Sequence, residues 1–387
     1  MSETASHLGD VTVLDFATVG PAARCSRVLA DYGATVVKVG APRGLQVQPP
    51  FHSYAGQRGM KRVEIDLKSE AGKRAFLRLA EGADVVIESF RPGVVKRLGI
   101  GYDALSQANP RLVYCSTSGY GQAGPYSQWA GHDINYLALG GFLDCSGRRA
   151  DGGPPLPGAT MADIAAGGMQ AAIAILAALH RRHATGRGEY LDVAVADGVL
   201  WCMSLWFDQF LATGDRPGPG HDVLTGRYAW YDVYPTRDGR WLAVGPIEPQ
   251  FYANLCKALG LEKWIPHQYE DAHQEAIRRD LRRVFETRDR DAWADELAPA
   301  NTCVAPVLSV AEAAEDPHFE SRRVFTEAQH PDRGRLRQVG PVLAGGDRQK
   351  TGYALPDLAK SDAEELLLDA GYSRDEIQKL RSEAAIA

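Results

Sequence analysis

The amino-acid sequence predicts an α/β protein, with a large domain on a Rossmann-like parallel sheet and a smaller α+β domain after it. Two observations predict this fold class. The first third of the chain alternates short β-branched runs with amphipathic segments, which is typical of strand–helix–strand units. A Gly/Pro cluster at residues 213–220 then separates this pattern from a segment with hairpin chemistry. The 387 residues, 45% of them hydrophobic, provide enough apolar surface for the cores of two or three domains.

The strands and helices of the large domain follow from the residue pattern. Expected strands cover 11–16, 35–39, 84–88 and 111–116, and expected helices cover 21–32 and 70–81. The first helix has Pro21 near its start and Gly33 just after its end, which is the usual chemistry of a helix start and stop.

A long Ala-rich helix is expected at residues 161–182. Its Gly167 and Gly168 lack side chains and so allow another backbone to pack close. The most apolar window, 164–179, is short for a membrane span and leads into His-Arg-Arg-His. We therefore expect a buried helix and no membrane partner.

The second half of the chain predicts the remaining domain boundaries. The large domain is expected at 1–212, a linker at 213–228 and the small α+β domain at 229–328. The small domain opens with a hairpin, 229–234 and 240–244 around the turn 236–239, and continues in helices to about residue 320.

The end of the chain is expected to return to the large domain. A polar segment predicts a return linker at 329–350, and residues 351–387 are expected to form helices that pack back on the large domain. Two capping-box patterns support these helices, Ser361 with Glu364 and Ser373 with Glu376.

Charge and cysteine usage exclude several function classes. There are 43 Lys and Arg against 49 Asp and Glu, a net charge of −6, so no global basic field draws the protein to nucleic acid or anionic lipid. The six cysteines are scattered singly, with no CxxC pair and no metal-like spacing with His. The N-terminus is polar and lacks the pattern of a secretory signal. We expect reduced thiols and a cytoplasmic protein.

Three residues are candidates for acid–base chemistry. His132 lies where a Gly-rich loop gives way to a helix, although a loop histidine is more often structural. Asp163 heads the most apolar helix, where an unpaired carboxylate is costly, and a helix cap is the simpler interpretation. Glu248 follows a strand end, where the simpler interpretation is a solvated loop acid or a charge at the N-terminus of a helix.

Basic residues after the strands are candidates for an anionic ligand. They gather at Arg58, Lys61, Arg62 and Lys68, and again at Arg91 and Arg97. Most such charges are solvated surface, but basic loops that follow α/β strands can also hold phosphates.

A glycine motif in the same region invites a dinucleotide interpretation. Residues 119–124 match GxGxxG, with Asp144 downstream, but Pro125 follows where the fingerprint needs a helix. We therefore expect no nicotinamide or flavin site.

These residues resemble the class III CoA-transferase (CaiB/BaiF) family over nearly the whole chain. The motifs that carry the resemblance are LADYGATVVKV at 29–39, IDLK at 65–68, FRPG at 90–93, SGYGQAGPY at 118–126, GHDINY at 131–136 and GY at 371–372. GHDINY together with GPIEPQFY at 245–252 is similar to the α-methylacyl-CoA racemase branch.

The resemblance implies a set of residue roles. In the racemase branch His132, Asp163 and Glu248 are the proton-transfer groups, with Glu248 paired to His132. Enolate stabilisation would come from backbone N–H groups after His132, that of Asp133 first. In the transferase branch Asp163 would instead be the covalent nucleophile. The expected substrate-binding residues are Asp133, Tyr136, Arg58, Lys61, Arg91 and Arg97.

The resemblance also implies the partners. The substrate is an acyl-CoA thioester, no metal or redox cofactor is required, and the chain forms an interlocked homodimer with each site shared between subunits. The sequence departs from the family pattern at Gly40 and Ala41, where an acidic residue and an arginine are common, and Arg43 is the expected substitute.

Three functions remain in view at this point: a racemase or epimerase of 2-methylacyl-CoA esters, a CoA-transferase, and a non-catalytic acyl-CoA-binding protein. The sequence does not identify the acyl group. One group of apolar residues could either line a surface for the acyl group or belong to the hydrophobic core: Trp201, Met203, Trp206, Phe207 and Phe210.

Overall fold

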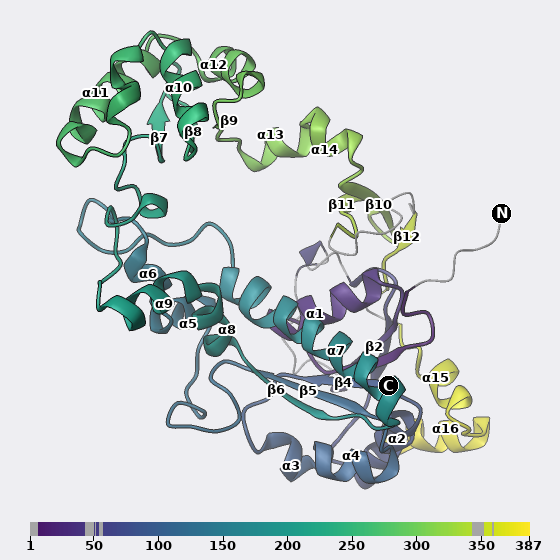
Figure 1. Ribbon diagram of the computed structural model, residues 1–387. Helices are drawn as coiled ribbons and strands as arrows, with labels where there is room; N and C mark the ends of the chain where they lie inside the picture. Colours follow the sequence, from purple (N-terminus) through teal and green to yellow (C-terminus); the bar gives the residue numbers. More distant parts are fainter. Residues whose placement is uncertain (1–6, 43–49, 51, 54–56, 343–351, 358–359) are drawn as a thin grey trace. The chain divides into compact units, whose positions relative to one another are not determined.

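The computed structural model describes residues 7–42, 50, 52–53, 57–342, 352–357 and 360–387 (Figure 1). The chain divides into two compact units. The first unit comprises 1–140, 157–204 and 317–387, and the second comprises 141–156 and 205–316. The sequence-based boundaries differ from these. Residues 141–156 and 205–212, expected in the large domain, group with the second unit, and residues 317–328, expected in the small domain, group with the first unit.

A six-stranded parallel sheet forms the centre of the first unit, in the order β3-β2-β1-β4-β5-β6. The strands are β1 (Thr12–Asp15), β2 (Thr35–Gly40), β3 (Lys61–Glu64), β4 (Val85–Glu88), β5 (Val113–Ser118) and β6 (Tyr190–Ala194). This is the strand order of a Rossmann-type sheet, so the predicted α/β fold class is confirmed.

Helices cover both faces of this sheet (Figure 1). The helices of the first unit are α1 (Gly20–Asp31), α2 (Glu70–Glu81), α3 (Val94–Leu98), α4 (Tyr102–Ala108), α5 (Asp133–Leu139), α7 (Gln170–Thr185), α8 (Val195–Cys202), α14 (Pro317–Ser321), α15 (Ala363–Asp369) and α16 (Arg374–Ser382). One core packs α2, α4, α15 and α16 on one face. A second core packs α1 and α7 on the other. Parallel sheets covered on both faces need apolar strands, as Val85–Ile87 illustrate.

The sequence pattern located the central strands but missed both edges of the sheet. Four expected strands correspond to β1, β2, β4 and β5. Both β3, with the sequence KRVE, and β6, with YLDVA, carry charged residues. Edge strands are half exposed, so their residues do not form the apolar runs that identify central strands.

The expected long helix is present but begins differently. Residues Ala162–Met169 are π-helical, and α7 continues to Thr185. A Cβ on Gly167 would lie 2.5 Å from Pro21 Cβ, and one on Gly168 3.0 Å from Pro21 O. These two glycines therefore let α1 approach, as predicted.

The combined helix Ala162–Thr185 is also long and apolar enough to cross a membrane by length and composition alone. Half of its most apolar window is buried inside the protein, with Ala171, Ile175 and Leu179 in the core beside the sheet. A core helix of a soluble protein meets the same criterion, so this one helix is weak evidence for a membrane span.

The second unit is built on a three-stranded antiparallel sheet, β7-β8-β9. Its elements are α6 (Phe142–Cys145), α9 (Ser204–Thr213), β7 (Asp232–Pro235), β8 (Trp241–Val244), α10 (Pro249–Ala258), α11 (Gln274–Phe285), α12 (Arg290–Leu297), β9 (Val304–Pro306) and α13 (Val310–Glu315). The core joins the sheet to α10, α11 and α12 through Leu242, Leu255, Leu281 and Trp293. The predicted hairpin is confirmed as β7 and β8.

The segment expected as a return linker is partly a hairpin. Antiparallel strands β10 (Phe325–His330) and β11 (Gly334–Val339) form it, and β12 (Tyr353–Ala354) joins β10 in parallel. Its outward residues are polar, which made the pattern resemble a linker; inward Thr326 and Ala328 are buried.

The C-terminal helices pack on the first core as predicted, through Leu367, Ile377 and Leu380. The Ser373–Glu376 capping box is present, whereas the Ser361 box is not formed, because α15 begins later.

Candidate active site

A pocket of about 440 Å³ opens at the carboxyl ends of β1, β4 and β5. Its lining residues are Val19–Pro21, Ser89–Pro92, Thr117–Tyr120, Ser127, Trp129–His132, Asn135, Tyr136, Asp163 and Val195. In the sheet order, connections run outward in opposite directions from the β1–β4 pair. A crevice at such a switch point is the usual ligand site of an open α/β sheet.

Asp163 enters this pocket from the π-helical segment. It is half-buried, and its backbone N–H donates to Asp133 Oδ1 at 2.9 Å. Met161 is the residue at the N-cap position, so the helix-cap interpretation of Asp163 is wrong. Single π-turns inside α-helices are frequent at functional sites.

The environment of Asp163 favours its neutral form. Burial, followed by the negative charge of Asp133, raises the pKa of the Asp163 carboxyl above its ordinary value of 3.8. The positive charges of Arg24 and His132 act in the opposite direction. A carboxyl with a raised pKa exchanges protons more readily near neutrality than an ordinary aspartate.

His132 lies in the same pocket, at the N-cap of α5. Its backbone N–H donates to Asn135 Oδ1 at 2.9 Å, which fixes the start of the helix. The histidine is exposed, so the ring is accessible to a ligand. The structure thus brings His132 and Asp163 to one pocket.

Aromatic side chains line the same pocket as His132. Tyr136 was an expected substrate-binding residue, whereas Tyr120 and Trp129 were not expected there. The buried Tyr136 donates its hydroxyl to Gly131 O at 2.7 Å, and burial raises its pKa to about 12. Tyr120 packs edge-on against Tyr136 and Trp129, with ring centroids 5.2 and 5.9 Å apart. Glycine is required at 119, because a Cβ there would lie 2.5 Å from the Tyr136 ring. The spacing of the glycines in the sequence does not predict this close contact between residue 119 and the Tyr136 ring.

A buried carboxyl, Glu88, positions the loop that presents Arg91. Glu88 Oε2 accepts the Phe90 N–H at 2.7 Å, and its other oxygen accepts the Ser116 hydroxyl. Burial raises the pKa of this carboxyl. Arg91 itself is exposed and lines the pocket. It is therefore well placed to meet an anionic part of a ligand.

The other basic candidates lie elsewhere. Arg58 is 1% exposed and donates to Val339 O at 2.6 Å and to Asp31, so it has no accessible face for a phosphate, and we correct its expected role to a structural one. Lys61 is paired with Glu365 at 2.7 Å on the surface. Arg97 is exposed on α3 and is not among the pocket-lining residues. The expected substitute Arg43 falls outside the described residues.

Glu248 belongs to the second unit. It is exposed after the end of β8 and is the N-cap residue of α10, where Pro249 occupies the first helical position. Its pairing with His132 stays a prediction.

The glycine motif after β5 has no dinucleotide geometry. Residues 119–132 form turns and contain no helix, whereas the fingerprint needs a helix at its third glycine. Gly121 and Gly124 have φ values of 83° and 91°, which explains why glycine is needed there.

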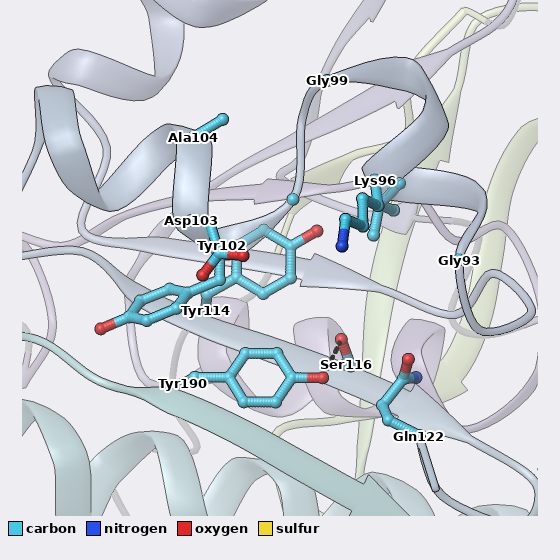
Figure 2. Close-up of a pocket in the computed structure, with 12 residues that line it drawn as sticks. Gly93, Lys96, Gly99, Tyr102, Asp103, Ala104, Tyr114, Ser116, Gln122 and Tyr190 are labelled. Atoms are coloured by element: carbon cyan, nitrogen blue, oxygen red, sulfur yellow. Dashed lines mark hydrogen bonds between the residues drawn. The ribbon is translucent and has the colours of Figure 1, made fainter.

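A second pocket of about 600 Å³ lies beside α3 and α4 (Figure 2). Three tyrosine rings from α4, β5 and β6 gather in it, those of Tyr102, Tyr114 and Tyr190. The Tyr190 hydroxyl is 3.2 Å from Ser116 Oγ. None of the expected catalytic residues lines this pocket, so the smaller pocket is the candidate active site.

The expected acyl surface shows both environments. Met203 is buried, whereas Trp201 is 74% exposed on α8. Phe210 on α9 is exposed as well. Trp201 is therefore a surface residue and is not part of the core.

Comparison with known proteins gives the family. The family model described as CoA-transferase family III matches residues 8–359, and the chain belongs to this family. The chain is 35% identical to human alpha-methylacyl-CoA racemase over 381 residues, which cover 98% of this chain and 97% of that protein. It is 32% identical to a succinyl-CoA:mesaconate CoA-transferase of Haloarcula hispanica over 349 residues, 84% of this chain and 86% of that one.

Among solved structures, the chain is similar to a CaiB/BaiF family protein from Brucella suis. The TM-score is 0.77 at 26% identity, and the match covers 93% of this chain and 98% of that one. Family members thus include racemases and transferases, and the reaction of this chain must be argued from its own site.

Proposed function

We propose that the protein is a racemase that interconverts the epimers of 2-methylacyl-CoA thioesters through an enolate. The observation that carries the proposal is that His132 and Asp163 line one pocket. Sequence identities of 35% and 34% with two alpha-methylacyl-CoA racemases, each over 98% of this chain, support the proposal. We propose that it acts as a homodimer.

The chemistry requires two acid–base groups around one carbon. One base removes the proton next to the thioester carbonyl, an enolate forms, and an acid on the other face returns a proton. A carboxyl with a raised pKa and an imidazole can hold complementary protonation states near neutrality. Each group then serves as base for one epimer and as acid for the other. The reaction moves only protons, so it requires no redox cofactor.

Other residues bind and orient in this scheme. Glu248 stabilises the charged His132 when that ring carries two protons. The Asp133 N–H, at the first position of α5, meets the enolate oxygen. Arg91 contacts a phosphate of CoA.

A CoA-transferase is the second candidate, because Asp163 lies in the pocket and transferases are among the relatives. In that reaction the Asp163 carboxylate attacks the thioester carbonyl and displaces CoA as its thiolate, which leaves a mixed anhydride on Asp163. The thiolate then attacks the Asp163 carbonyl and releases the donor acid. A second acid reverses these two steps, leaves as the new CoA ester and regenerates Asp163. Offering each epimer of a 2-methylacyl-CoA without any free acid to accept CoA separates the two reactions. The racemase gives the same mixture from either epimer, whereas a transferase leaves each epimer unchanged.

Replacing Arg91 with Ala is expected to raise KM for CoA esters more than it lowers kcat. A phosphate contact remote from the reacting carbon contributes equally to ground and transition states. Steady-state kinetics measure the split, with Arg74→Ala as a control outside the pocket. A wild-type KM in Arg91→Ala would show that Arg91 is ordinary surface.

With the epimer whose proton Asp163 removes, kcat/KM is expected to fall at acidic pH. The midpoint of this fall, the acid limb of the pH profile, is expected above pH 3.8. Asp163 must be ionised to act as base, and its pKa is raised, so activity falls as the pH drops through that raised value. Asp133→Asn removes a negative neighbour but keeps Oδ1 as acceptor for the Asp163 N–H. This change lowers the pKa of the Asp163 carboxyl and moves the limb to lower pH. A limb that stays in place, or rises, contradicts the assignment.

A further inference from the structure

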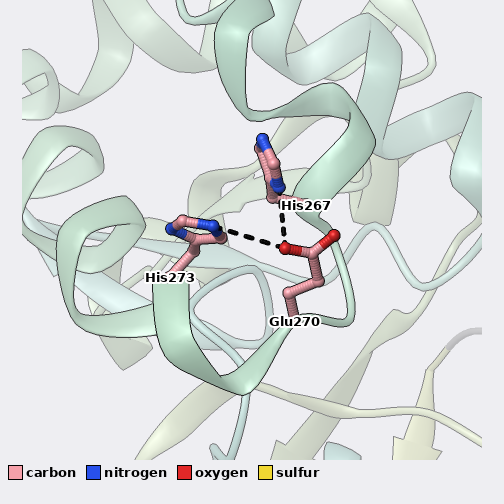
Figure 3. A group of neighbouring side chains, drawn as sticks. All are labelled: His267, Glu270 and His273. Carbon is pink, nitrogen blue, oxygen red and sulfur yellow. Dashed lines mark hydrogen bonds and ion pairs between the residues drawn. The ribbon is translucent and has the colours of Figure 1, made fainter.

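Three metal-ligating side chains converge on the second unit, away from the candidate catalytic residues in sequence. They are His267, Glu270 and His273, and their ligand atoms all lie within 4.8 Å of one another (Figure 3). Glu270 Oε2 is 2.8 Å from His267 Nδ1 and 3.3 Å from His273 Nε2. One carboxylate oxygen therefore faces two imidazole nitrogens.

Buried amides hold the backbone that presents these side chains. Gln274 is 5% exposed, and its Nε2 donates to Gln268 O at 3.0 Å and to Glu270 O at 3.1 Å. Trp230 Nε1 donates to the same Gln268 carbonyl at 2.7 Å. The turn is thus fixed from inside the core, and the three side chains meet without any rearrangement of the backbone. A preformed backbone is what a ligand site requires.

The two nitrogen–oxygen separations are similar to those between ligands on one tetrahedral metal ion. Zinc lies 2.0–2.1 Å from imidazole nitrogen and about the same from carboxylate oxygen, which places neighbouring ligands about 3.3 Å apart. The two nitrogen–oxygen distances of 2.8 and 3.3 Å are close to this value.

We propose that His267, Glu270 and His273 form a site for a divalent transition-metal ion of the zinc class. Two imidazoles and one carboxylate suit zinc, cobalt or nickel, whereas magnesium and calcium prefer oxygen ligands alone. Three protein ligands leave a fourth position for water. The spacing is H-x₂-E-x₂-H, so all three ligands come from one short segment.

The site is connected to the segment that carries Glu248. Gln268 Nε2 donates to Ile247 O at 3.0 Å, and the Tyr269 hydroxyl donates to the same oxygen at 2.8 Å. Both donors lie between the ligands His267 and Glu270. A bound ion therefore stiffens the turn that contains Gln268 and Tyr269. This turn holds Ile247, the residue before Glu248.

Isothermal titration of Zn²⁺ into the chelator-treated full chain at pH 7.5 tests the site. We expect one ion per chain, bound at least tenfold more weakly by His273→Ala and by Glu270→Gln. The matched controls are exposed residues outside the cluster, His180→Ala and Glu275→Gln, and these bind as the wild type does. Absence of binding at about 100 μM protein, or equal affinity in all variants, overturns the proposal.

Cobalt distinguishes this site from the exposed thiols of Cys202 and Cys303. Thiolate ligands add intense near-ultraviolet charge-transfer absorption to bound Co²⁺, and nitrogen and oxygen ligands do not. We expect a spectrum without that absorption; its presence assigns the ion to cysteine and contradicts the proposal.

Trp264 provides a reporter that does not depend on the folding of the ligand variants. Its ring lies 6.1 Å from that of His267 and 5.8 Å from that of His273. Bound Ni²⁺ should quench its emission, and Trp264→Phe should remove the metal-dependent loss. Unchanged quenching in that variant places the ion elsewhere. None of these readouts depends on racemase activity, so the metal site can fail while the proposed function stands.

Discussion

Asp163→Asn is expected to lower turnover by a factor of about 10² to 10⁴, the usual contribution of a positioned acid–base group. The substitution keeps the shape of the side chain and removes its ability to exchange a proton. The Asp163 N–H keeps its bond to Asp133 Oδ1, so the pocket keeps its shape. His132→Ala is expected to have an effect in the same range. Affinity for CoA esters should change far less, because neither side chain is expected to hold the nucleotide.

The control is Asp197→Asn, which changes an exposed first-turn acid of α8 that does not line the pocket. This variant should retain wild-type kinetics. Circular dichroism and urea unfolding establish that each variant folds. If folded Asp163→Asn retains turnover within tenfold of the wild type, Asp163 is not the acid–base group.

Lys38→Met is expected to lower the free energy of unfolding by about 3 to 5 kcal/mol, the cost of leaving a buried charge without its partner. Lys38 is 5% exposed and pairs with Asp15, which is fully buried. Its ammonium also donates to Ala17 O at 2.8 Å and to Ser26 Oγ at 2.9 Å. These bonds hold the loop after β1, whose next residues border the pocket.

Urea unfolding measures the effect, with Lys61→Met as the matched control. Lys61 pairs with Glu365 on the surface, where its side chain is 34% exposed, so its loss should cost at most about 1 kcal/mol. The double variant Asp15→Asn, Lys38→Met removes both charges and should recover part of the loss. Equal costs for Lys38→Met and Lys61→Met would show that the buried pair is not needed.

The central part of the fold was predictable because its strands are buried on both faces. A strand buried on both faces, such as Val85–Ile87, needs apolar residues at every position, and such a run is easily recognised in the sequence. Pro21 and Gly33 mark the ends of α1. The edge strands and the β10–β11 hairpin were not predictable in this way. Their exposed faces tolerate polar residues, so the sequence there resembles a loop. The π-helical start of the long helix leaves no sequence signature of its own.

The site divides along a similar line. His132 and Asp163 were candidates because each lies near a helix start, and the resemblance to the family supplied their expected roles. The structure places both in one pocket. Glu88 was not recognised as a residue that positions the Arg91 loop, because in the sequence it is simply the last residue of a buried strand. Arg58 was misassigned because charge alone does not show that a side chain is enclosed and paired with Asp31. Burial and pairing depend on tertiary contacts, which one sequence does not reveal.

Hydrogen exchange at the α-carbon tests the central claim most directly. Each epimer of a 2-methylacyl-CoA is incubated with the protein in D₂O, and the deuterium at that carbon is followed by mass spectrometry and NMR. We predict that both epimers gain one deuterium there and converge on the same mixture, and that Asp163→Asn slows the exchange by the same factor as turnover. Absence of exchange, together with transfer of CoA to an added free acid, would contradict the racemase and assign Asp163 to a transferase.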